Sequence, residues 1–163
     1  MTLFFDDEQP PHGRRMTRRV LRGFDAHAFA AVRRRAGISV SDLSRLSGAS
    51  LSTLHHWEAG RRTPQVDILA TVMKVLQAPI DAVVLIAPEQ RYPGDWRVMS
   101  GLTQPQAAAR AQLSTAILQR IERGEYPLSD KNAEALAGVL GISATEYHAA
   151  YQRARQRPAG APS

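Results

Sequence analysis

The 163-residue sequence contains no cysteine, few aromatic residues and no long hydrophobic run. The absence of cysteine excludes disulfide bonds and thiolate metal sites. The longest apolar run, residues 82–87, is far shorter than the stretch of about 20 residues that a bilayer-spanning helix needs. The first ten residues, MTLFFDDEQP, are acidic and lack the basic-then-apolar order of a secretory signal. These absences predict a soluble, cytoplasmic protein with no membrane contact.

Arginine, by contrast, is abundant. The chain has 21 basic and 15 acidic residues, a formal net charge of +6, and only Lys74 and Lys131 are lysines. The planar guanidinium of arginine suits phosphate oxygens and guanine edges, which agrees with a nucleic-acid partner. A GC-rich genome would raise the arginine content equally. The excess positive charge remains as a modest indication of a polyanionic partner.

The first 24 residues are expected to form a flexible basic arm. They contain an acidic DDE, a Pro-Pro pair and the segment RRMTRRVLRG, and they offer few apolar side chains for burial. Such an arm could lie along DNA phosphates or enter a minor groove. The alternative is a solvated terminus without a specific role.

From residue 25 the spacing of apolar residues becomes helical. Ser39 and Ser50 are expected to cap a second and a third helix, separated by the turn SGAS. The pair TP at 63–64 is expected to begin a fourth helix, and Pro79 a short fifth. The run AVVLIA at 82–87 could be a strand by composition, but its place after four helices favours a helix.

The same order of signals restarts in the second half. Asp95 is expected to cap a short helix, Thr103 and Gln106 to form a capping box, and Ser114 and Ser143 to cap later helices. Seven structurally meaningful positions agree at one constant offset of 64 residues, which indicates an internal duplication. These pairs are Gly37/Gly101, Ser39/Thr103, Ser50/Ser114, Leu54/Leu118, Glu58/Glu122, Gly60/Gly124 and Leu76/Leu140.

The duplication predicts an all-α fold made of two tandem five-helix domains. The predicted segments are an arm at 1–24, a first domain at 25–87, a linker at 88–94, a second domain at 95–155 and a tail at 156–163.

Both repeats resemble the helix-turn-helix domain of lambda repressor and Cro, often called the XRE family. The resemblance lies in AGISVSDLSRLSGASLSTLHHWEAGRRTP and SGLTQPQAAARAQLSTAILQRIERGEYP and, with flanking helices, covers about residues 25–152. In the second repeat, GLTQ and RIERGE are highly typical of the family. The first repeat departs at Val40, where the family usually has Gln, and the second at Gln112, where the turn usually has Gly.

The resemblance implies a transcriptional regulator of bacterial or phage type, by default a repressor, that binds double-stranded DNA with the third helix of each repeat in the major groove. Gln104 matches the family's phosphate-binding glutamine. Arg120 could pair with guanine and His56 with a purine N7, the alternative being solvated surface side chains. The full set of candidate DNA contacts is Leu51, Ser52, His55, His56, Arg61, Arg62, Gln104, Thr115, Ala116, Gln119 and Arg120.

Two acidic residues close the third helices, Glu58 and Glu122. In the resembling family an arginine four residues before the glycine that ends the first helix pairs with this glutamate. The resemblance therefore implies partly buried pairs between Arg33 and Glu58 and between Arg97 and Glu122.

Other classes of function find little support. No phosphate loop, no nucleophile elbow and no pair of acids in a pocket-forming setting is evident, so we expect no enzyme, no catalytic residue and no cofactor. His55 and His56 project about 100° apart on a helix, so a shared metal ion is not expected. A protein-interaction module remains the alternative function. The DNA-bound form is either a homodimer, with the AVVLIA helix or the end of the second repeat as its interface, or a monomer acting as a pseudo-dimer.

Overall fold

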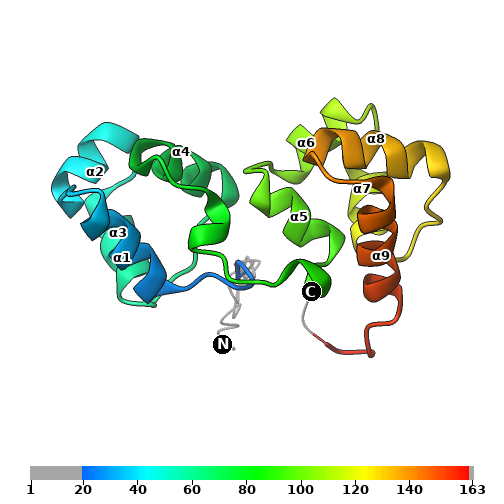
Figure 1. Ribbon diagram of the computed structural model, residues 1–163, viewed down its shortest axis with the longest axis horizontal. Coiled ribbons are helices and arrows are strands. Elements are labelled where there is room, and N and C mark those ends of the chain that lie inside the picture. Colours follow the sequence, from blue (N-terminus) through cyan, green and yellow to red (C-terminus); the bar gives the residue numbers. More distant parts are fainter. Residues whose placement is uncertain (1–19, 162–163) are drawn as a thin grey trace, which may run out of the picture.

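The computed structural model describes residues 20–161, which contain nine α-helices and two short 3-10 turns arranged as two lobes (Figure 1). Within this range the only extended pairing is an isolated antiparallel bridge between Phe24 and Val84. The all-α tandem fold is thus confirmed. The elements are α1 (Ala26–Arg35), α2 (Val40–Ser47), α3 (Leu51–Glu58), α4 (Val66–Leu76), η1 (Ile80–Ala82), η2 (Pro88–Gln90), α5 (Pro93–Met99), α6 (Gln104–Arg110), α7 (Thr115–Glu122), α8 (Asp130–Leu140) and α9 (Ala144–Arg155).

The first lobe packs α1 to α4 around an aromatic centre. Phe29 of α1 and Trp57 of α3 are buried, with ring centroids 5.6 Å apart in an edge-to-face arrangement. Leu54 and Leu69 close this core from α3 and α4 without solvent exposure. The apolar face of each helix therefore fixes the angle at which α3 is held against the others.

The second lobe repeats this arrangement with α5 to α8 and adds the long α9. Leu118 and Ile121 of α7 and Leu136 of α8 are buried, and Tyr147 of α9 fills the space beside them. The Tyr151 hydroxyl donates to the Tyr126 carbonyl at 2.8 Å, which ties α9 to the loop after α7. Helix α9, the fifth helix of this repeat, is therefore part of the second core.

The capping signals of the sequence are confirmed at the helix-turn-helix elements. The hydroxyls of Ser39, Ser50 and Ser114 each accept a hydrogen bond from the backbone N–H three residues later. Thr103 and Gln106 form the full capping box at the start of α6. Each cap satisfies an N–H that the helix itself leaves unpaired, so the helix starts are fixed locally.

The predicted fifth helix of the first repeat is wrong. Residues 80–82 form only a single 3-10 turn, and the chain then runs extended. Asp25 N–H donates to the Val83 carbonyl and Leu85 N–H to the Gly23 carbonyl, both at 2.8 Å. Val84 is buried and Leu85 is 55 % exposed, the alternation of an extended segment. Pairing with a distant part of the chain overrides the helical expectation.

Two predicted helix starts also differ. Thr63 does not cap α4; its hydroxyl accepts from the Leu21 N–H at 2.8 Å, and Gln65 is the N-cap, without a side-chain bond. Asp95 lies inside α5, where its carboxylate accepts from the N–H of the N-cap residue Tyr92 at 2.8 Å. The Thr63 hydroxyl is thus used by a residue far away in the sequence, and the Asp95 carboxylate by a residue three positions earlier, so neither caps the helix as predicted.

The first lobe begins earlier than residue 25. Phe24 packs against Phe29 and Trp57, with ring centroids 6.0 and 6.3 Å away, and Leu21 packs on the same core. Residues 20–24 therefore belong to the first domain rather than to the predicted arm. The rest of that arm, residues 1–19, lies outside the described residues.

The connector between the lobes is exposed at residues 87–90 and packed from Arg91 onward. Arg91 is 8 % exposed; its Nε donates to the Ile86 carbonyl at 3.0 Å, and its guanidinium lies 4.5 Å from the centroid of the Trp96 ring. Arg153 of α9 donates to the Arg91 carbonyl at 2.9 Å. These contacts hold the connector against the second lobe.

Helix α5 joins the two cores. It opens the second repeat, yet its residue Val98 belongs to the buried cluster of the first lobe. Gly101, just after α5, lies so close to the first lobe that a Cβ there would be 2.9 Å from the Ala70 Cβ and 3.4 Å from the Ile80 Cδ1. The two repeats therefore share an apolar interface.

Candidate nucleic-acid interface

The turn between α2 and α3 leaves one face of α3 open. Gly48 takes the left-handed conformation at φ 78°, and Ser50 then caps α3. Leu54 and Trp57 point into the core, which leaves the opposite face to solvent. Of the candidate contacts on this helix, Leu51 (42 % exposed), Ser52 and His55 are exposed and His56 is half-buried.

The α6–α7 unit presents the equivalent face with different side chains. Thr115, Ala116 and Arg120 are exposed and Gln119 is half-buried. The Arg120 guanidinium lies 5.1 Å from the centroid of the Tyr126 ring, an arrangement that orients the side chain while leaving its N–H groups available. The structure therefore keeps the two faces comparable in position and unlike in chemistry.

Gln112 shows how the second turn is made without glycine. It adopts φ 57°, the left-handed conformation that Gly48 has in the first repeat, and it is exposed. The turn geometry is retained although a side chain other than glycine is strained there. The departure from the family pattern therefore changes the conformational energy of the turn and not its shape.

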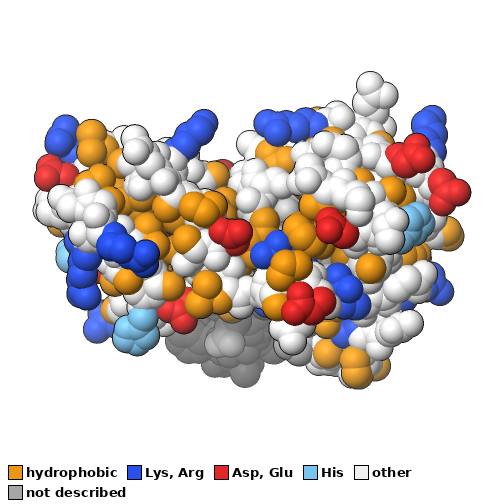
Figure 2. All heavy atoms as spheres, viewed as in Figure 1, with side chains coloured by type: hydrophobic (Ala, Val, Ile, Leu, Met, Phe, Trp, Pro, Cys, Tyr) orange, Lys and Arg blue, Asp and Glu red, His pale blue; other side chains and the backbone are white. Residues whose placement is uncertain are grey.

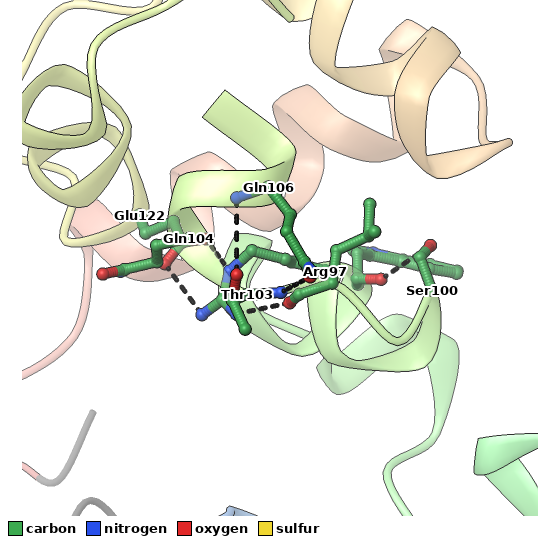
Figure 3. Close-up of polar contacts among 8 residues, drawn as sticks. Arg97, Ser100, Thr103, Gln104, Gln106 and Glu122 are labelled. Atoms are coloured by element: carbon green, nitrogen blue, oxygen red, sulfur yellow. Dashed lines mark hydrogen bonds and ion pairs between the residues drawn. The ribbon is translucent and has the colours of Figure 1, made fainter. Parts of the chain in front are cut away.

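Gln104 and Val40 occupy equivalent positions at the starts of α6 and α2. The Gln104 amide donates to Glu122 Oε2 at 2.7 Å, so it is anchored at the edge of α7 (Figure 3). Val40 is half-buried and packs against the first core. The second repeat therefore has a polar side chain at this helix start, and the first repeat has an apolar one in its place.

The two predicted arginine–glutamate pairs are present. Arg97 Nε lies 2.5 Å from Glu122 Oε1, and its other nitrogens reach Glu122 Oε2 at 3.3 Å and the Leu102 carbonyl at 2.8 Å (Figure 3). Arg33 pairs with Glu58 in the same bidentate way and donates to the Ile38 carbonyl at 3.0 Å. Each pair ties the first helix of its repeat to the end of the third.

A buried tyrosine lies close to the second pair. Tyr147 is 1 % exposed, and burial, followed by the Glu122 carboxylate, raises the pKa of its phenol. The phenol therefore stays neutral beside the Arg97–Glu122 pair.

Beyond α3 the first repeat carries Arg61 and Arg62, both exposed. At the same offset of 64 the second repeat carries Glu125 and Tyr126. The first repeat thus has two cations where the second has an acid and an aromatic ring. The first repeat therefore has two additional cations after α3 and no polar side chain at Val40, the start of α2.

An ion pair between Arg22 and Asp95 links the start of the described chain to α5. Arg22 also lies 4.5 Å from the centroid of the Tyr92 ring. Burial raises the pKa of the Asp95 carboxyl, while the Tyr92 N–H and Arg22 act in the opposite direction. The local sequence does not indicate this contact, because Arg22 is one of several arginines in the segment predicted to be a flexible arm.

The face drawn in Figure 2 carries acidic, basic and apolar side chains intermixed over both lobes. Among residues 20–161 no group of three or more potential metal ligands lies together. No helix in that range is long and apolar enough to cross a membrane.

Comparison with known families places both repeats. Residues 26–85 match a family described as "Helix-turn-helix domain", and residues 95–147 match one described as "Helix-turn-helix". No curated protein matches the chain. One match lies in each lobe, and the matches include α2–α3 and α6–α7, the units described above. The protein therefore consists of two tandem helix-turn-helix domains of the lambda-repressor and Cro-like type, the domains of DNA-binding regulators.

Proposed function

We propose that the protein is a sequence-specific transcriptional repressor that reads double-stranded DNA with α3 and α7 in the major groove. One observation carries the proposal: two copies of one scaffold expose unlike side chains at equivalent positions of their third helices. His56 corresponds to Arg120 and His55 to Gln119 at the offset of 64. Because the fold is the same in both repeats but the exposed side chains of α3 and α7 differ, the two helices suit two different DNA half-sites.

Phosphate contacts differ between the repeats in this proposal. In the second repeat Gln104, at the first position of α6, contacts the DNA backbone through its side chain. In the first repeat Arg61 and Arg62 take over this role, since Val40 offers no donor. Anchoring of the first repeat therefore depends more strongly on salt than anchoring of the second.

The chain acts as a covalent pseudo-dimer in this proposal. The connector, packed from Arg91 onward, and the shared interface at Val98 and Gly101 support a fixed relation between the two reading helices. One of the two interfaces predicted for the alternative homodimer, the run at 82–87, is largely closed, because Val83, Val84 and Ile86 are buried in the first core. The preferred DNA site is then asymmetric, with half-sites about one helical turn apart.

The test is selection of bound duplexes from a random library, with the mass of the complex measured by light scattering. An asymmetric site bound by one chain is expected, and a perfect palindrome bound by two chains would contradict the pseudo-dimer. On the selected duplex, Arg120→Ala and His56→Ala should each cost about 1–3 kcal/mol and relax the preference in different half-sites. Arg34→Ala, at an exposed arginine on α1, is the matched control.

The second candidate function is a protein-interaction module, favoured by the apolar Val40 at a position where a phosphate contact is expected. The two functions respond differently to salt. Phosphate-led binding weakens by orders of magnitude between 50 and 200 mM salt when roughly 6–10 phosphates are contacted, whereas an apolar protein contact barely changes. A salt-independent association with a protein, without duplex binding, would support this second function.

A further inference from the structure

A cleft of about 580 Å³ lies between the two lobes. One wall comes from the first lobe, with Leu21 and Val66, and the other from α5, α6 and α7 of the second, with Val98 among its residues. Its volume is in the range of small-molecule sites, which are clefts of roughly 300–1,000 Å³ that often lie at domain interfaces. The cleft therefore has the size and the apolar lining of a ligand site.

The charged side chains of the cleft do not balance. Arg22 is paired with Asp95 and Arg97 with Glu122, so these four contribute no net charge. Arg123 and Arg157 also line the cleft.

Neither of these two arginines forms an ion pair within residues 20–161. The Arg157 guanidinium lies 5.5 Å from the centroid of the Tyr92 ring, and no carboxylate of the described chain neutralises it. Two guanidinium groups beside an apolar wall thus remain without an anion.

We propose that this cleft binds a small amphipathic anion, a carboxylate, sulfonate or phosphate joined to an apolar ring or short chain. The anionic group would receive the N–H donors of Arg123 and Arg157, since guanidinium and a planar or tetrahedral oxyanion match in geometry and charge. The apolar part would lie against Leu21, Val66 and Val98. The site draws on both lobes, so occupation also adds contacts between them.

The ligand would compete with DNA at the second repeat. Gln104 and Gln119, both candidate DNA contacts, line the same cleft. A molecule seated there excludes a phosphate from their neighbourhood, and by linkage the duplex lowers the affinity for the ligand by the same factor. This part rests on the proposed DNA-binding function; the ligand site itself does not.

The site is tested without DNA by fluorescence titration of the full chain with 8-anilinonaphthalene-1-sulfonate, which combines a sulfonate with aromatic rings. One saturable site is expected. The double variant Arg123→Gln/Arg157→Gln should weaken binding about tenfold or more, and Arg34→Gln/Arg35→Gln, which removes the same charge from exposed positions of α1, should leave it unchanged. N-phenyl-1-naphthylamine, which lacks the sulfonate, should bind the wild type at least tenfold more weakly.

Several results would overturn the ligand site. These are no saturable binding, equal binding by the cleft variant, or equal binding of the neutral probe. If the sulfonate does not bind while the cleft variant loses duplex affinity, the two arginines are phosphate contacts and the proposal is wrong.

The competition is tested separately on the selected duplex. Saturating probe should weaken duplex binding in the wild type and not in the cleft variant. Unchanged duplex affinity with the probe bound would overturn the competition. A chain that binds the probe but no duplex would instead count against the proposed function while supporting the ligand site.

Discussion

The first and second repeats share the caps of their second and third helices, the buried leucine of the third helix (Leu54 and Leu118) and the arginine–glutamate pair, but they are closed in different ways. The first ends in a 3-10 turn and an extended segment that pairs with residues 23–25. The second ends in α9, whose Tyr147 and Tyr151 are buried in its core. The helix-turn-helix unit is therefore compatible with two quite different closing elements, provided that the back of the third helix stays covered.

Equivalent glycines also have unequal surroundings. Gly37 and Gly101 both adopt the left-handed conformation, at φ 68° and 70°. A Cβ at Gly37 would meet nothing within 4 Å, whereas one at Gly101 would press into Ala70 of the first lobe. Gly101 therefore serves both the local turn and the close contact between the two lobes. The variants below test how far the equivalence of the repeats extends, from the largest expected effect to the smallest.

Loss of the buried carboxylates should give the largest effect. Glu122→Ala removes the partner of the Arg97 charge from a side chain that is 8 % exposed, and Glu58→Ala removes the partner of the Arg33 charge from a side chain that is 17 % exposed. We expect losses in the free energy of unfolding of about 4 and about 3 kcal/mol, measured by urea denaturation. Glu125→Ala, at an exposed position just after α7, should stay within about 0.5 kcal/mol. An unmoved thermal midpoint for Glu122→Ala would contradict this role.

Alanine at the paired glycines should separate the local turn from the interface. Gly37→Ala pays only the left-handed strain, about 1 kcal/mol. Gly101→Ala adds the collision with Ala70 and Ile80, for a total of about 3 kcal/mol. The comparison uses the free energy of unfolding of the full chain. Equal losses would show that the two lobes do not press together at this point.

Substitutions in the two turns, at Gly48 and Gln112, should change the free energy of unfolding in opposite directions. Gln112→Gly should raise the free energy of unfolding by about 1 kcal/mol, because glycine adopts φ 57° without strain, and Gly48→Gln should lower it by a similar amount. Gln112→Ala keeps the strain and should change little. A destabilising Gln112→Gly would mean that the glutamine side chain contributes more than the strain costs.

The smallest effects are expected from exchanging the residues that open α2 and α6. Gln104→Val should weaken duplex binding about fivefold, the loss of one hydrogen bond of about 1 kcal/mol. Val40→Gln should strengthen it about twofold, since part of the gain is lost with the packing of Val40 on the core. Fluorescence anisotropy on the selected duplex measures both, and a Val40→Gln variant that binds more weakly would place the first repeat away from the phosphates.

The sequence predicts best what neighbouring residues decide. The caps at Ser39, Ser50 and Ser114 follow from local spacing, the arginine–glutamate pairs are implied by the family resemblance, and the structure confirms both. The extended run at 83–87 could not be predicted, since its partners at 23–25 lie about 60 residues away and local apolarity fits both helix and strand. Val98 shows the same limit, because the local sequence does not indicate which lobe an apolar side chain of α5 will join. The DNA-contact residues themselves remain predictions.

Val98 gives the duplication a further consequence. If the repeats were expressed as separate chains, the core of the first would lack the Val98 side chain. Its surface would also expose Ala70 and Ile80, which Gly101 covers in the intact protein. Such halves are no longer interchangeable modules, and neither is expected to be as soluble as the whole. Heating the intact chain in a calorimeter should accordingly give a single endotherm, in which both repeats melt together.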